Sequence, residues 1–106
     1  MSGILRRFEI LLPTRFNDGQ SIPDELFADT LAELEQQFGS VSSESQVIHG
    51  RWSYQGQMYR DDSVRVFVDV PDTATSREFF VGYKEQLKSR FRQLDIWMVT
   101  YSIEVI

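Results

Sequence analysis

Hydrophobic and polar positions alternate over residues 47–70, and this pattern predicts a β-hairpin. In its second half, four valines at every second position alternate with Arg65, Phe67 and Asp69. Successive side chains of a strand point to opposite faces, so the valines mark the face that packs on a core. The first half, Val47–Tyr54, alternates less cleanly, and Gly56 supplies a turn between the two strands. The pattern leaves the strand register around residues 55–63 open.

The segments before and after this hairpin predict two further strands and two helices. Strands are expected at residues 6–12 and 95–105, and helices at residues 21–38 and 75–92, where apolar residues recur at helical spacing. The order is β-α-β-β-α-β, which is typical of a ferredoxin-like α+β sandwich. We therefore expect one domain over residues 1–106, an antiparallel sheet with both helices on one face.

The periodicity also predicts which side chains face the helices. We expect the valines of the hairpin and the Trp97 face of the last strand to meet them, and Leu94 to end the buried stripe of the second helix. The opposite face of the sheet is then left open. It would carry apolar and charged side chains together: Glu9, Leu11, Arg65, Phe67, Asp69, Met98 and Thr100.

Composition excludes several classes of function. The net charge of −5 argues against a general affinity for nucleic acid or for anionic membranes. The chain has no cysteine and a single histidine, and it lacks calcium-loop spacing, so we expect no metal and no cofactor. The N-terminal residues form neither a signal peptide nor a membrane span, which makes the cytoplasm the expected location.

Three short motifs in and beside the hairpin carry a resemblance. They are Gly50-x-Trp52, Gly56 and the polar run Arg60-Asp61-Asp62-Ser63, with weaker matches at Tyr83-Lys84 and Phe91-x-Gln93. Together they resemble an uncharacterised family of small bacterial α/β domains of unknown function. The resemblance covers about half of the chain. It implies the fold and no particular reaction or ligand.

The hairpin also holds the candidate site residues. His49 is a candidate general acid or base because its ordinary pKa lies near neutrality, and the alternative is a half-exposed strand histidine. Arg51 and Arg65 are candidates to hold a small organic anion, unless neighbouring carboxylates already pair with them. Trp52 and Tyr54 are candidates to line a pocket, unless they are core residues or cross-strand pairs.

Two functions are compatible with these residues. The first, which we expect, is a small binding or assembly module that forms a homodimer through its open sheet face. The alternative is a small acid–base enzyme of the dimeric α+β barrel type, which would use His49 to act on a small organic anion.

Overall fold

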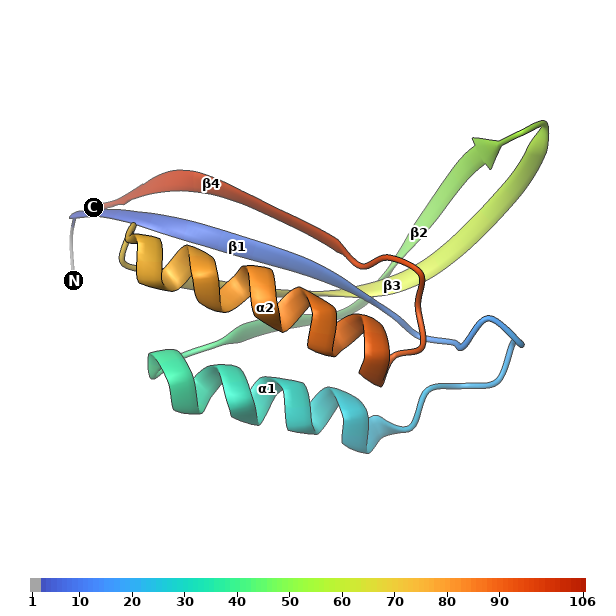
Figure 1. The fold of residues 1–106 in the computed structure, drawn as a ribbon, viewed down its shortest axis with the longest axis horizontal. Helices are drawn as coiled ribbons and strands as arrows, with labels where there is room; N and C mark the ends of the chain where they lie inside the picture. Colours follow the sequence, from blue (N-terminus) through green and yellow to red (C-terminus); the bar gives the residue numbers. More distant parts are fainter. Residues whose placement is uncertain (1–2) are drawn as a thin grey trace.

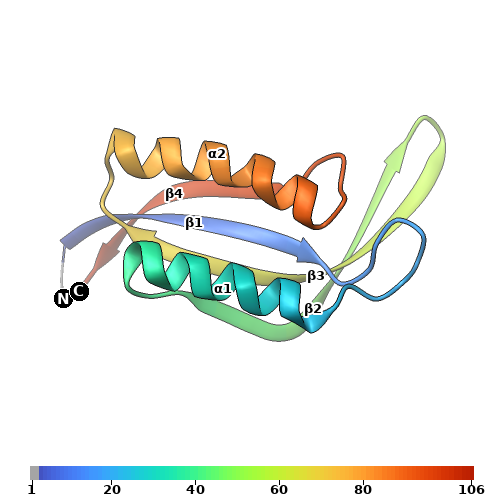
Figure 2. The ribbon, with the colours of Figure 1, turned by 60° about the horizontal axis from the view of Figure 1, so that its bottom comes forward.

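A computed structural model describes residues 3–106 and shows a four-stranded antiparallel sheet with two helices on one face (Figures 1 and 2). This confirms the α+β, ferredoxin-like prediction. The strand order across the sheet is β2-β3-β1-β4. In chain order the elements are β1 (Gly3–Pro13), α1 (Asp24–Phe38), β2 (Ser42–Tyr54), β3 (Gln57–Val70), α2 (Ala74–Arg90) and β4 (Trp97–Val105).

Strand β1 lies between β3 and β4, and the alternation of its side chains determines which residues lie on each face of the sheet. Phe8, Ile10 and Leu12 are buried beneath the helices and lie directly opposite valines of β3. The Phe8 ring stacks on Phe80 of α2, with ring centroids 4.0 Å apart. Directly opposite residues of an antiparallel pair share a face, so the valine stripe lies in the core as predicted.

Both helices begin and end at residues suited to those positions. Helix α1 begins at Asp24, after Pro23, and its first turn carries two carboxylates near the positive end of the helix dipole. It ends at Gly39, whose φ of 86° is the left-handed conformation that glycine adopts without strain. Helix α2 begins after Thr73, whose hydroxyl accepts a hydrogen bond from the backbone N–H of Ser76.

A polar cluster joins the two helices. The guanidinium of Arg90 donates two hydrogen bonds to the carboxylate of Glu33, both 2.8 Å long, and a third to Thr30 at 2.9 Å. The hydroxyl of Tyr83 donates to the same carboxylate at 2.7 Å. Arg90 lowers the pKa of Glu33, while burial, helped by Glu33, raises the pKa of Tyr83. The cluster therefore carries an ionised pair that fixes how α1 lies beside α2.

The side chains of β4 point to the opposite faces of the sheet from those that its sequence pattern predicts. Met98 lies opposite Ile10 on the helix side, whereas Trp97 lies opposite Leu11 on the open face and is 65% exposed. Leu94, expected in the core, is 93% exposed. The physical reason is the turn before β4. There Ile96 is buried, and its backbone N–H donates a hydrogen bond to the carboxylate of Asp95. The alternation of β4 is therefore shifted by one residue relative to the prediction.

Strands β2 and β3 continue well past the helices as a two-stranded arm, residues 47–62 (Figure 1). The arm begins at a bulge in β2, where the register shifts between Glu44 and Ile48. Its directly paired residues include Trp52 with Tyr59 and Arg51 with Arg60, which settles the register that the sequence left open. The side chains of the arm are largely exposed, because neither helix reaches them.

Within residues 3–106, neither helix is long and apolar enough to span a membrane. The cytoplasmic location stays a prediction.

The face assignment of β3 leads to a stability prediction. Val68 is 1% exposed, so Val68→Ala should lower the free energy of unfolding by about 1–3 kcal/mol through lost burial and an unfilled cavity. The same substitution at Val81, which is 66% exposed on α2, should change it by less than about 0.5 kcal/mol. Urea denaturation of both variants measures the difference. Equal effects would contradict the assignment.

Candidate functional site

The larger of two cavities on the helix side lies between α1 and the edge of the sheet where β2 and β3 pair. Its volume is about 560 Å³, within the range of small-molecule sites. The floor is apolar and consists of Leu12, Ile22, Phe27, Leu31, Val64 and Val66. The space stays open because small residues, Ala28 of α1 and Ser43 of β2, stand where larger side chains would fill it.

The rim of this cavity is polar. Asp24 comes from the first turn of α1. Glu44, whose carboxylate turns to the open face, is the last residue of β2 to pair before the bulge. Thr14, Ser21 and Ser43 add hydroxyl groups. An apolar floor with a few polar groups at its edge suits a ligand that has a flat apolar body and hydrogen-bond donors.

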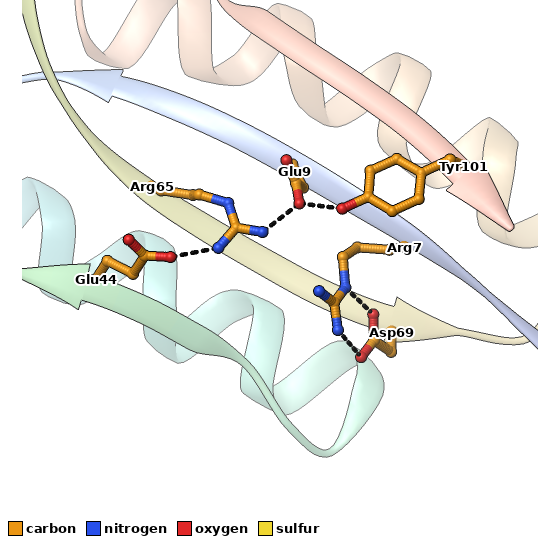
Figure 3. A network of polar contacts seen from close by, with 6 residues as sticks. All are labelled: Arg7, Glu9, Glu44, Arg65, Asp69 and Tyr101. Atoms are coloured by element: carbon orange, nitrogen blue, oxygen red, sulfur yellow. Dashed lines mark hydrogen bonds and ion pairs between the residues drawn. The ribbon is translucent and has the colours of Figure 1, made fainter. Parts of the chain in front are cut away.

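Glu44 connects the cavity to a network of charges on the open face (Figure 3). One nitrogen of the Arg65 guanidinium donates to Glu44, and another donates to Glu9 of β1. The hydroxyl of Tyr101 on β4 donates to the same oxygen of Glu9. The network thus joins all four strands.

A second ion pair lies beside this network on the same face. The guanidinium of Arg7 donates to both oxygens of Asp69, at 2.7 and 3.0 Å. The guanidinium carbons of Arg7 and Arg65 each lie 4.4 Å from the centre of the Phe67 ring. Two cations stacked on one aromatic ring gain cation–π attraction, and their carboxylate partners neutralise them.

Hydrogen bonding controls the protonation of the network. The Arg65 guanidinium is the largest cause of the lowered pKa of Glu9, and the Tyr101 hydroxyl lowers that pKa further. Hydrogen bonds to Glu9 and Glu44 raise the pKa of Arg65 in turn. Glu9 is therefore ionised at neutral pH, which suits it to accept hydrogen bonds and not to act as an acid.

The second cavity lies between α2 and β4 and has a volume of about 340 Å³. Its charged side chains pair within the cavity wall, Lys84 with Asp95 at 3.1 Å and Lys88 with Glu85 at 3.2 Å. The hydrogen bond from Lys84 lowers the pKa of Asp95. This is the solvated helix face that the alternating charges of α2 indicate.

Four of the residues proposed from the sequence lie on the arm, on two different sides. Strand β3 alternates without interruption, so Tyr59 and Asp61 share a side with Arg65, while Arg60 and Asp62 take the other. Trp52 stacks on Tyr59 at 4.4 Å and donates to Asp61 at 2.7 Å, so Trp52 and Tyr54 belong to the side of Arg65.

His49 and Arg51 lie on the opposite side of the arm from Arg65. His49 bonds to Asp62 at 2.7 Å and its side chain is 76% exposed, while Arg51 lies opposite Arg60. The expectation that His49, Arg51 and Arg65 converge on one group is therefore wrong, because the register separates them along the strands and between the faces. Their catalytic or ligand-binding roles stay predictions.

Sequence reasoning missed Asp24, Glu44 and Tyr101. Asp24 reads as a helix-start residue, and Glu44 lies in a serine-rich run that resembles a linker. Tyr101 alternates with Thr100 and was expected to face the helices. The sequence holds one signal for Glu44, which is the only charged residue between Gly39 and His49. Among residues 3–106, no group of three or more histidine, aspartate or glutamate side chains is arranged to hold a metal ion.

The fold is similar to that of solved phage SAM lyases. One, solved in complex with S-methyl-5'-thioadenosine, superimposes with a TM-score of 0.65 over 95% of this chain and 90% of that one, at 14% sequence identity. Another, in the apo state, gives a TM-score of 0.50 over 98% and 90% of the two chains, at 21% identity. No protein-family model and no curated protein matches the sequence.

This comparison corrects one expectation. The chain shares its whole architecture with proteins that are named as enzymes, which overturns the prediction of a binding or assembly module. The alternative, a small enzyme, agrees better with these neighbours. Self-association is a separate expectation that the comparison does not address.

The lowered pKa of Glu9 gives a pH-dependent prediction. A carboxylate whose pKa is lower in the folded state stabilises the fold above its unfolded pKa, and that contribution disappears as the pH falls through its folded pKa. Glu9→Gln should therefore cost about 1–3 kcal/mol at pH 7, and the difference from wild type should shrink below about pH 4.3.

Urea denaturation at a series of pH values between 7 and 3 measures this difference. Glu104→Gln, at an exposed position of β4, is the control and should change little at any pH. A constant gap between wild type and Glu9→Gln across the series would contradict the ionised network.

Proposed function

We propose that the protein is a small enzyme that binds the adenosyl thioether part of a sulfonium nucleoside in the cavity between α1 and β2, and that it cleaves SAM. The observation that carries the proposal is the polar rim over an apolar floor, in a fold that holds S-methyl-5'-thioadenosine in a solved neighbour. The volume of about 560 Å³ is sufficient for a nucleoside of this size.

The chemistry of the ligand matches the two parts of the cavity. A purine ring is flat and largely apolar, which suits a floor that includes Phe27, Leu31 and Val66. The ribose hydroxyls and the purine amine are donors, and the carboxylate of Asp24 is an acceptor.

The reaction would break the bond between the sulfonium sulfur and the amino-acid side chain. The electron pair of that bond stays on sulfur, which becomes a neutral thioether. The carbon that loses sulfur gains electrons either from the substrate's own carboxylate, closing a lactone, or from a neighbouring C–H bond whose proton passes to a base. Because positive charge disappears from sulfur in either route, an apolar floor that excludes water favours the step.

His49 is not needed for the first of these routes. It lies on the arm, and it is not among the residues that line the cavity. A His49→Ala variant tests the base that the sequence suggests. Loss of activity would assign the proton-removing route to His49, and unchanged activity would leave only routes that do not use it.

Binding in the cavity is tested by isothermal titration with S-methyl-5'-thioadenosine. Asp24→Asn should weaken binding about ten- to one-hundred-fold, the effect of losing a charged hydrogen-bond acceptor. Leu31→Trp should abolish binding by filling the floor. Glu25→Gln, next to Asp24 but exposed and outside the cavity, is the matched control and should bind like wild type.

Cleavage is tested by incubating the protein with SAM and following S-methyl-5'-thioadenosine by chromatography. Wild type and Glu25→Gln should release it at the same rate, and Leu31→Trp should release none. Circular dichroism verifies that each variant is folded. Release of no thioether by the wild type, together with no binding in the titration, would reject the proposal.

A further inference from the structure

The open face of the sheet is rich in apolar side chains, although the helices cover only the other face. Those that are exposed or half-exposed there are Leu5, Leu11, Phe67, Trp97, Val99 and Ile103. Trp97 is 65% exposed and Tyr101 is 41% exposed. A face with so many exposed apolar side chains marks an interaction surface more often than a solvated one.

The charged residues on this face pair with one another, two arginines with three carboxylates. Arg7 pairs with Asp69, and Arg65 pairs with Glu9 and Glu44. The side chains of Arg7, Arg65 and Glu9 are no more than a quarter exposed. A face whose charges are already paired can be covered without leaving an unpaired buried charge, so it suits a protein partner better than nucleic acid or a charged membrane.

The arm extends this face away from the body of the protein. The side that carries Trp52, Tyr59 and Asp61 has the same parity on β3 as Arg65 and Phe67, so the aromatic side continues the open face. Trp52 is 46% exposed and Tyr54 is 58% exposed. A two-stranded ribbon with nothing packed on it is only marginally stable, which indicates that this arm is covered in the working protein.

The size of the molecule gives an independent measure of the uncovered area. A compact protein of 12.4 kDa has an accessible surface of about 6,100 Å², whereas this chain has 7290 Å². The excess, about 1,200 Å², is larger than the roughly 800 Å² that one partner contributes to a stable interface. The radius of gyration, 14.6 Å, likewise exceeds the value of about 13 Å for a compact chain of this length.

We propose that a second copy of this chain covers the open face, and that the arm of each copy reaches over the sheet of the other. A symmetric contact buries the same patch in both copies, so one largely apolar face with paired charges satisfies both. At the usual rise per residue the strands of the arm, residues 47–54 and 57–62, are about 26 and about 20 Å long. Four strands span about 14 Å, so the arm can cross the partner's sheet.

The two tryptophans provide a direct test, because Trp52 and Trp97 are the only ones in the chain and both lie on this side. In Trp97→Phe, the fluorescence reports Trp52 alone. On dilution from about 100 µM to below the dissociation constant, Trp52 emission should shift to the red as the mass from sedimentation velocity falls from at least two chains to one. A monomer at the highest concentration, or an oligomer in which Trp52 emission stays that of an exposed indole, would overturn the proposal.

Paired variants of the arm separate its two sides. The double variant Trp52→Ser, Tyr59→Ser on the aromatic side should raise the dissociation constant at least tenfold. The double variant Arg51→Ala, Arg60→Ala on the other side should leave it unchanged. Equal weakening by both would indicate a structural effect on the arm and overturn the assignment. Titration of the same variants with S-methyl-5'-thioadenosine reports the cavity separately, so the two proposals fail independently.

Discussion

The central position of β1 is the constraint on which the rest of the structure depends. It pairs with β3 on one side and with β4 on the other, so its alternation decides what lies on each face of the whole sheet. Phe8, Ile10 and Leu12 are buried beneath the helices, and Arg7 and Glu9 are thereby forced onto the open face. If the register of β1 shifted by one residue, the three apolar side chains would turn to the open face and the charges of Arg7 and Glu9 would be buried in the core.

The charges placed on the open face determine its character. An acidic chain has carboxylates available for each arginine. Strand β3 supplies Asp69 opposite Arg7, and β2 supplies Glu44 opposite Arg65. The pairs are partly buried by the aromatic ring of Phe67 and by Tyr101. The pairing leaves a face of apolar side chains and paired charges.

The bulge in β2 after Glu44 links the cavity with the arm. Up to that residue, β2 pairs in register with β3 beside α1, and small side chains there leave the cavity unfilled. Beyond it, the two strands leave the helices and form the arm (Figure 1). Bulges commonly occur beside functional sites because they re-aim side chains. Glu44, at this junction, is a lining residue of the cavity, and its carboxylate pairs with Arg65 on the open face.

The sequence by itself determined the elements, their order and the core of three strands and two helices, because hydrophobic period and helix-end residues are local signals. It also identified Arg65, Phe67 and Asp69 as open-face residues, since they alternate with three buried valines and the half-buried Val64. Only the tertiary structure decided the face of β4, because Ile96 entered the core and shifted the phase of a strand whose two faces differ little in polarity. It alone brought Asp24 and Glu44 to one rim and placed His49 away from Arg65, because register between distant strands depends on bulges and turns that local patterns do not encode.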